Sequence, residues 1–483
     1  MKNFFIGTLL LLLLSTAYSQ DKNTDYSDAF RIIEVWMEAQ KDYEQLPGIS
    51  ALVVQDQEIL WSGASGQANP EQNVKSEPST LYSICSISKL FTSVAIMKLY
   101  DEGKLRLDDK VSDLLPWYDL DQKFTDSWPI TVRTLLTHSS GLPREANFPY
   151  WTGPDFPFPS SESIKAELEN QKTLYPSSTY FQYSNLGLTL LGDIVEEVSG
   201  VPFETYVKQN ILDPLGLANT RTELPEDLYG QDLAIGYSAL SREHQRQKVA
   251  LFQAKGITAA AGFSSNVIDL GEFASWQFRL LDSTVTEILN PSTLKYMQNV
   301  HWTDPDWKTT WGLGFVVSKG SDGEKIVGHG GSCPGYRSSI SLRPESKRAY
   351  VVMINASGTN PHKYVNGIHA ILKKAKGAEK KKTSKDTETG LNLQGFSGYY
   401  NSMPWQSELY VSAWYGKLLM LGLPTESPAA AMTIFRHIDG DTFRRVRDDG
   451  ELGETLVFER NDAGQITRCK NHGNYYTKMI RQP

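Results

Sequence analysis

The sequence predicts an α+β domain, an antiparallel sheet flanked by helices with a helical subdomain, followed by a second, small all-β barrel domain. Residues 90–99 and 186–198 have the apolar content and the length of buried helices. Residues 312–355 hold several candidate strands, most of them separated by turn-forming residues. After residue 395, apolar and polar residues alternate over short segments only. Helices combined with a strand meander, followed by a region of strands alone, favour two separate domains.

The N-terminus has the three parts of an export signal. Lys2 supplies the positive charge, residues 4–14 form an apolar run, and Ala17-Tyr18-Ser19 is a small-x-small cleavage site. The run is shorter than the ~20 residues that cross a bilayer, so we expect cleavage after Ser19 rather than a membrane anchor. The mature protein is then expected in the periplasm or secreted, with no further membrane span.

Length and charge limit the remaining possibilities. The 483 residues suggest two to three domains, and 40% hydrophobic content permits a large core. A net charge of −8 offers no basic face, and there is no nucleic-acid motif, so we expect no nucleic-acid partner. After the signal peptide at residues 1–19, we predict a main domain at residues 20–375, a Lys-rich linker at 376–392 and the barrel at 393–483.

The main domain can be read element by element. Residues 28–46 have helical periodicity, and Pro47-Gly48 ends that helix. Residues 49–54 are apolar like a buried strand and lead through a turn into a hairpin partner at 58–61. Short helices or turns are expected at 108–117 and 131–137, an irregular Pro-rich and aromatic loop at 147–161, strands at 312–317, 324–328, 336–342 and 349–355, and a helix at 362–374.

The C-terminal residues predict the small barrel through their turns. Turn signals recur at Asp439-Gly440, Asp449-Gly450, Asp462-Ala463-Gly464 and His472-Gly473. Short strands at this spacing are typical of an antiparallel barrel. Residues 373–390, dominated by lysine, have few apolar groups that could pack, so we interpret them as a solvated linker.

The first chemical motif is Ser86-Ile87-Ser88-Lys89, where an apolar helix begins. A lysine one helical turn after a serine lies on the same face and can take its proton. Burial of the amine would make its neutral form accessible. A second S-x-x-K run begins at Ser292, but it follows Pro291 without matching partners, so we discount it.

Two further segments complete the candidate site. Tyr183-Ser184-Asn185 precedes a helix and offers a phenol that can relay a proton and an amide that can contact a substrate. His329-Gly330-Gly331-Ser332 follows a predicted strand, where paired glycines permit close approach of backbone or substrate. A similar Y-x-N run at Tyr364 lies within a predicted helix and is interpreted as structural.

Together these three ordered motifs resemble those of the penicillin-recognising serine hydrolases, which include β-lactamases, D-alanyl-D-alanine carboxypeptidases and related esterases. The Y-x-N form of the middle motif is similar to the class C β-lactamase branch. The flanking residues 101–109, 135–142 and 328–331 are also similar, and the resemblance spans about residues 49–355. It implies a β-lactamase/transpeptidase-like fold, and the tail resembles the small β-barrel appended to many such hydrolases.

The resemblance also assigns roles. Ser86 becomes the acylated nucleophile, Lys89 its proton partner and Tyr183 the general base, with Asn185 contacting the substrate. The backbone N–H groups of Ser86 and Ser332 form the oxyanion hole. His329 stands where many relatives have lysine and Gly330 where they often have threonine, which disfavours efficient β-lactam hydrolysis. Arg337, on the next predicted strand, is a candidate replacement for the missing positive charge, but we interpret it first as a surface arginine. Whether Lys89 or Tyr183 holds the proton stays open, because the two groups titrate as a pair.

The resemblance places two of the three cysteines close together. Cys85 precedes the nucleophile, and Cys333 follows the oxyanion-hole residue. For an exported chain this implies a Cys85–Cys333 disulfide, with two buried free thiols as the alternative. Cys469 is then left over in the barrel.

The sequence thus predicts a secreted serine hydrolase acting on an amide or ester bond of a small-molecule or peptide substrate, without metal or cofactor. The alternative is a non-catalytic periplasmic sensor or binding protein that keeps the fold. A metallohydrolase is disfavoured because no metal-binding motif is present, and an α/β-hydrolase because G-x-S-x-G is missing. The sequence leaves the substrate and the oligomeric state open.

Overall fold

The structure is a computed structural model that describes residues 24–380 and 391–480. The predicted signal peptide at residues 1–19 lies outside the described residues. The chain forms two compact units: residues 44–365 make one, and the segments before and after them make the other. In the described part of the chain, no helix is both long enough and apolar enough to span a bilayer.

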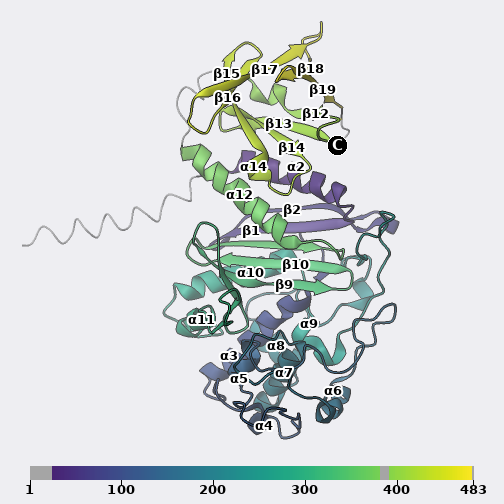
Figure 1. Ribbon diagram of the computed structural model, residues 1–483, viewed down its shortest axis with the longest axis vertical. Coiled ribbons are helices and arrows are strands. Elements are labelled where there is room, and N and C mark those ends of the chain that lie inside the picture. Colours follow the sequence, from purple (N-terminus) through teal and green to yellow (C-terminus); the bar gives the residue numbers. More distant parts are fainter. Residues whose placement is uncertain (1–23, 381–390, 481–483) are drawn as a thin grey trace, which may run out of the picture. The chain divides into compact units, whose positions relative to one another are not determined.

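An antiparallel sheet is the centre of the larger unit (Figure 1). Its strand order is β3-β2-β1-β11-β10-β9-β8-β7-β6 among the described residues. The strands are β1 (Gly48–Gln55), β2 (Glu58–Asn69), β3 (Val74–Lys75), β6 (Trp302–Thr303), β7 (Thr310–Trp311), β8 (Val316–Lys319), β9 (Lys325–Cys333), β10 (Tyr336–Arg343) and β11 (Arg348–Ile354). A separate two-stranded sheet pairs β4 (Tyr82–Ser83) with β5 (Ser264–Ser265).

Helices cover this sheet and form a subdomain beside it. They are α3 (Ser88–Asp101), α4 (Val111–Leu114), α5 (Val132–Leu136), α6 (Ser161–Glu167), α7 (Asn185–Ser199), α8 (Phe203–Val207), α9 (Thr258–Ala261), α10 (Val267–Leu281) and α11 (Pro291–Met297). Helix α10 packs on β1 and β11, whereas α3 packs against α7 and α9. The predicted α+β architecture, an antiparallel sheet flanked by helices with a helical subdomain, is therefore confirmed.

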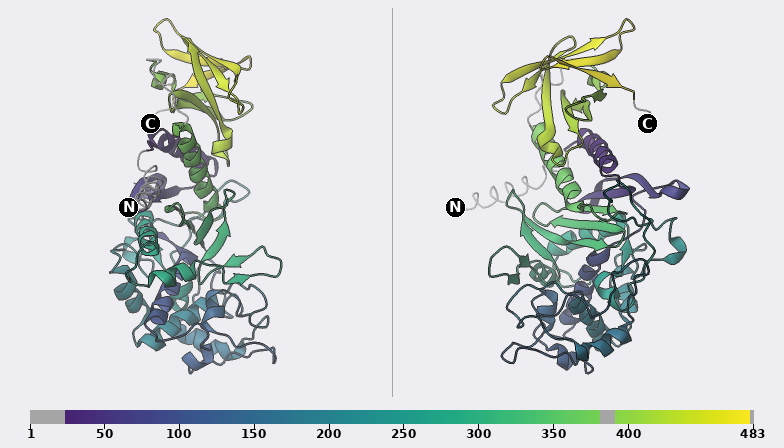
Figure 2. Two further views of the ribbon diagram at one scale, coloured as in Figure 1. Left: turned by 90° about the vertical axis from the view of Figure 1, so that its left-hand side faces the viewer. Right: turned by 45° about the vertical axis from the view of Figure 1, so that its right-hand side comes forward.

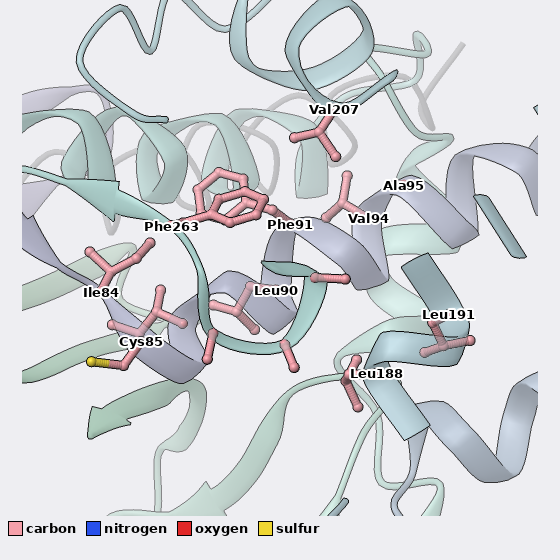
Figure 3. Packing of buried hydrophobic residues seen from close by; sticks show 14 of the residues in the cluster. Ile84, Cys85, Leu90, Phe91, Val94, Ala95, Leu188, Leu191, Val207 and Phe263 are labelled. Atoms are coloured by element: carbon pink, nitrogen blue, oxygen red, sulfur yellow. The ribbon is translucent and has the colours of Figure 1, made fainter. Parts of the chain in front are cut away.

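The core explains why α3 is apolar on nearly every side. From Leu90 to Met97 every side chain of this helix is buried. The Phe91 ring stacks on Phe273 at 4.5 Å between centroids and lies 5.4 Å from Phe263. Figure 3 shows Phe91 next to Phe263. Cys85 lies in the turn that leads into the helix of Phe91. Dense packing of this kind fixes the helix and the residues at its N-terminus.

Among the predicted boundaries that the structure corrects, two concern the candidate site and the linker. Strand β9 continues from Lys325 through Cys333, so His329 to Ser332 lie within the strand and not after its end. The ladder to β10 carries the strand past the glycines, with Gly331 opposite Ser338. Helix α12 (Pro361–Lys380) extends beyond the predicted end at residue 374 into the predicted linker, since lysine and alanine are good helix formers.

The smaller unit contains the predicted barrel, and its strands can be followed in green to yellow in Figure 2. Its eight strands close on themselves in chain order. They are β12 (Gly398–Asn401), β13 (Glu408–Trp414), β14 (Lys417–Leu423), β15 (Met432–Asp439), β16 (Thr442–Val446), β17 (Leu452–Arg460), β18 (Ile466–Asn471) and β19 (Asn474–Met479), with α14 (Pro428–Ala431) before β15. Phe396, Phe443 and Phe458 pack together in the barrel core.

Helix α2 (Ser27–Tyr43) belongs with the barrel, although the sequence analysis placed it in the main domain. The Trp36 indole N–H donates to the Thr425 carbonyl at 2.8 Å, and Asp28 accepts from the Tyr415 backbone N–H at 2.9 Å. The helical periodicity identifies the apolar face of this helix but not the surface that covers it.

Candidate active site

Ser86 lies in a 3-10 turn, Cys85–Ile87, that leads into α3. It is the one partly exposed residue in the buried run from Thr80 to Met97. The preceding Cys85 has a φ of 52°, a left-handed conformation that costs energy for a residue with a side chain. The strained turn places a single hydroxyl at the surface of an otherwise closed core.

Lys89 is completely buried and has three hydrogen-bond acceptors around its amine. Its Nζ atom lies 3.2 Å from Ser86 Oγ and donates at 2.7 Å to both Asn185 Oδ1 and the Ala260 carbonyl. Burial lowers the pKa of Lys89 to about 7, while the charge of Glu145 acts in the opposite direction. Both protonation states of the amine are therefore populated near neutral pH.

The three contacts of Lys89 have different roles in proton transfer. A neutral amine has two N–H donors and one lone pair. The two 2.7 Å bonds to Asn185 and Ala260 can keep both donors, which leaves the lone pair for the longer contact with Ser86. The amine is thus held in an orientation suited to accepting the serine proton.

Tyr183 also reaches the candidate nucleophile. Its side chain is hydrogen-bonded to Ser86, and burial raises its pKa above the ordinary value of 10.0. The Lys89 amine and the Arg144 guanidinium each lie 5.0 Å from the centre of its ring. The His138 ring packs on the phenol at 4.3 Å. In the free protein the phenol therefore keeps its proton near neutral pH, whereas Lys89 is partly neutral.

His138 packs against Tyr183 and binds the segment that carries it. The sequence analysis did not predict this role. His138 is buried, and its Nδ1 accepts a 3.1 Å hydrogen bond from the Ser184 backbone N–H. Burial and the nearby Lys89 lower its pKa well below 6.5, so the ring is neutral. A neutral ring can pack under Tyr183 without adding charge to the site.

Glu145 is a second residue that the sequence analysis missed. Its Oε1 accepts from Asn185 Nδ2 at 2.5 Å and from the Trp151 indole at 3.0 Å. Because Asn185 Oδ1 accepts from Lys89, the two bonds together fix which way the Asn185 amide faces. Burial raises the pKa of Glu145. A glutamate in a loop carries no motif, and only its spatial contact with Asn185 reveals it.

His329 lies on the strand that borders the nucleophile and is uncharged. Its Nδ1–H donates to the Gly330 carbonyl at 2.6 Å, and its Nε2 has no hydrogen-bond partner among the described residues. Burial lowers its pKa to about 3. The position therefore provides a neutral ring near Tyr183, 6.2 Å between centroids, and no fixed positive charge.

Gly331 is where the strand meets the nucleophile segment. A Cβ atom there would collide with the Ile84 carbonyl and with Ser338 Oγ. Ser338 Oγ donates to the same carbonyl at 3.1 Å, which ties β10 to the residue two positions before Ser86. At Gly330 a Cβ would meet only His362 Nε2 closely, at 3.2 Å. The close approach predicted from the paired glycines thus belongs to Gly331, and Ser332 follows it within the strand.

The predicted disulfide between Cys85 and Cys333 is not formed in the structure. Both cysteines are buried free thiols. They are neighbours, as expected, because the two side chains are in hydrogen-bond contact, and burial followed by this contact raises the pKa of Cys333. Two buried thiols in contact satisfy the packing without a covalent bond. Cys469 is a third buried thiol, in the barrel core.

The similar motifs elsewhere lie apart from these residues. Ser292 and Lys295 are exposed on α11, and Tyr364 is buried on α12 with its hydroxyl bonded to Glu44 at 3.2 Å. Arg337, the candidate for binding a carboxylate, donates to the backbone carbonyls of Cys333 and Tyr336 instead. Within residues 24–380 and 391–480, no cluster of three or more His, Cys, Asp or Glu has the arrangement of a metal site.

Comparisons with known proteins identify the family of the chain. The sequence profile of the Beta-lactamase family matches residues 34–373. The "Beta-lactamase-like protein 2" of Dictyostelium discoideum is 35% identical over 192 residues, which cover 39% of this chain and 34% of that protein. A "Putative D-alanyl-D-alanine carboxypeptidase" of Escherichia coli (strain K12) is 27% identical over 312 residues, 59% of this chain and 70% of that protein. The chain thus spans about a third of the length of the first relative.

A solved structure extends the similarity to nearly the whole chain. The octameric penicillin-binding protein homologue from Pyrococcus abyssi superimposes with a TM-score of 0.63 at 27% identity, covering 92% of this chain and 99% of that one. This coverage exceeds the 340-residue span of the family match and includes residues beyond it.

Proposed function

The chain belongs to the Beta-lactamase family, and on that premise we propose that it is a serine hydrolase that cleaves an amide or ester bond through an acyl-enzyme on Ser86. The observation that carries the proposal is the buried Lys89 amine, held by Asn185 and Ala260 with its third contact on Ser86 Oγ. A buried amine with a pKa of about 7 is suited to activating a hydroxyl.

The acylation step follows from these contacts. Neutral Lys89 takes the proton of Ser86 as Oγ attacks the substrate carbonyl carbon, and the carbonyl π bond becomes an oxyanion. The backbone N–H groups of Ser86 and Ser332 stabilise that charge. The protonated Lys89 lowers the cost of ionising Tyr183, so the phenol gives its proton to the leaving group and regains one from Lys89. The departing amine or alcohol leaves an ester on Ser86.

Deacylation reverses the roles of the same groups. A water molecule takes the place of the leaving group and gives its proton to the Tyr183–Lys89 pair as it attacks the ester carbonyl. Collapse of the oxyanion breaks the bond to Ser86 Oγ, which recovers a proton from Lys89. In the free protein we assign the base to Lys89 and not to Tyr183, because burial lowers the pKa of the amine and raises that of the phenol.

The charge of the site indicates the substrate class. His329 stands where many relatives have lysine and is neutral, and Arg337 is held by backbone carbonyls. The site therefore offers a substrate carboxylate no fixed cation at this strand, which favours esters and peptide amides over β-lactams. The D-alanyl-D-alanine carboxypeptidase name of the Escherichia coli relative makes D-amino-acid peptides with an amidated C-terminus, which carry no terminal carboxylate, the first amides to test.

We also propose that the chain is exported and cleaved after Ser19. The basic residue, apolar run and small-x-small site support this proposal. N-terminal sequencing of the protein from its native host tests it, and the expected first residue is Gln20. A mature chain that still begins at Met1 would contradict export by this signal.

Steady-state assays test the hydrolase proposal. The panel consists of p-nitrophenyl esters, D-amino-acid peptides and a chromogenic cephalosporin. We expect turnover of an ester or peptide that falls by orders of magnitude in Tyr183→Phe, while the matched control Tyr364→Phe keeps the wild-type rate. A chain that becomes acylated once and never turns over would instead support the non-catalytic sensor.

A further inference from the structure

The barrel has a cavity at one of its ends, separate from the candidate active site. Its volume is about 380 Å³. It is lined by the β12–β13 loop, the connection from β14 through α14 to β15, and the β18–β19 hairpin. In an antiparallel barrel with strands in chain order these connections share one end, so the cavity lies at the barrel mouth. Barrel mouths are frequent ligand sites.

The wall of the mouth contains an unsatisfied hydrogen-bond acceptor. Asn471, at the end of β18, is 8% exposed, and its Oδ1 atom has no hydrogen-bond partner among the described residues. Leaving a buried carbonyl unpaired costs free energy that a donor from a ligand would recover. The unpaired Asn471 carbonyl oxygen therefore favours a ligand that has a hydroxyl or N–H group to donate to it.

The rim of this cavity presents apolar side chains that are largely exposed in the described part of the chain. Trp405 is 81% exposed and lines the cavity, and Met403 on the same loop is 67% exposed. Tyr476 adds a second aromatic ring, and Leu409 and Met420 add aliphatic surface. An indole at the opening of a cavity is a platform for a flat apolar face.

The composition of the cavity lining also limits the charge that a ligand can carry. Apart from the aromatic and aliphatic residues, the lining consists of hydroxyl and amide side chains, Gly422, Pro424 and Ala431, and no charged residue belongs to it among the residues that the structure describes. The Gln406 side chain packs directly over Gly422, where a Cβ atom would collide with it. An ionic ligand would lose its hydration without a partner, so a neutral ligand fits this cavity.

We propose that the barrel mouth binds an uncharged sugar ring. A pyranose has a flat C–H face to lie on the Trp405 indole and hydroxyl donors for Asn471 Oδ1, and the amide and hydroxyl groups of the wall can pair its other hydroxyls. This site uses barrel residues only, so the proposal does not depend on the proposed hydrolase function. It gives the barrel a binding role that the catalytic residues do not share.

Calorimetric titration of the full chain with glucose and with N-acetylglucosamine tests the proposal. We expect one of them to bind, with an affinity lowered about tenfold or more by Trp405→Ala and by Asn471→Leu, the loss expected for one contact of this kind. Asn471→Asp, which keeps an acceptor, should retain more affinity than Asn471→Leu. The matched control is Trp307→Ala, which removes an 83% exposed tryptophan of the other unit.

The remaining outcomes separate the alternatives. Thermal unfolding of each variant shows whether the barrel is intact. Ser86→Ala should bind the sugar like the wild type. Failure of both sugars to bind the folded wild type, or equal binding to Asn471→Leu, would overturn the proposal. Binding of a neutral long-chain alcohol in place of either sugar would overturn it in favour of a lipid site.

Discussion

The side-chain amide of Asn185 bridges Lys89 and Glu145. Its Oδ1 accepts from the amine at 2.7 Å, and its Nδ2 donates to the carboxylate at 2.5 Å. An amide placed between a donor and an acceptor has one favourable orientation. The pair Lys89–Asn185 therefore forms a rigid unit, which holds the amine against Ser86 Oγ.

We predict that acylation depends on the protonation of Lys89. Burial lowers its pKa to about 7, so the amine is protonated and inactive below that pH and becomes a base above it. The value of kcat/KM for a neutral ester should rise with pH and level off above about 8. His329, with a pKa of about 3, contributes no second transition in this range. A rise centred near the ordinary lysine pKa of 10.5 would contradict the assignment.

Glu145 should tune that pH dependence. Its negative charge raises the pKa of Lys89, so Glu145→Gln, which keeps an acceptor for Asn185, should move the midpoint of the profile to lower pH. We expect a shift below about one unit because the group is a neighbour and not a direct contact. Glu145→Leu should instead free the Asn185 amide and lower kcat/KM on the order of 10²-fold. The pH profiles of kcat/KM for both variants check these effects. If both profiles are identical to that of the wild type, Glu145 does not position Asn185.

The two glycines of β9 should respond differently to a methyl group. Gly331→Ala places a Cβ atom on the Ile84 carbonyl and should reduce both thermal stability and activity strongly, since the strand must move away from Ser86. Gly330→Ala meets only His362 Nε2, at 3.2 Å, and should be tolerated. Melting temperatures and ester turnover of the two variants measure the difference. Equal tolerance of both would show that the strand does not approach as described.

The correction on the cysteines leads to a chemical prediction. Because Cys85, Cys333 and Cys469 are free and buried, the folded protein should react slowly with iodoacetamide. In denaturant without a reducing agent, mass spectrometry should find all three cysteines alkylated. Resistance of one pair until a reducing agent is added would restore the disulfide.

The sequence predicted the parts of the site that have motifs and missed those that have none. Ser86, Lys89, Tyr183 and Asn185 come together as expected, since helical spacing and order along the chain identify them. Glu145 lies in a loop whose path no pattern encodes, so its contact with Asn185 could not be foreseen.

The fold shows the same division. Periodicity predicted the central helices, the meander and the barrel, but the glycines of β9 hid its continuation to Cys333, because pairing with β10 outweighs their poor strand propensity. Helical periodicity also predicted helix α2, but it did not show that Trp36 packs on the barrel unit. An apolar helix face can pack equally well on the main domain or on the barrel.

The central claim is that Ser86 is the activated nucleophile, and mass spectrometry of the acylated protein tests it most directly. After incubation with a fluorophosphonate, the account predicts one covalent adduct, located on the peptide that contains Ser86. The adduct should be absent in Ser86→Ala and unchanged in Ser292→Ala, the matched control from the exposed second S-x-x-K run. Wild-type labelling of folded Ser86→Ala would contradict the account.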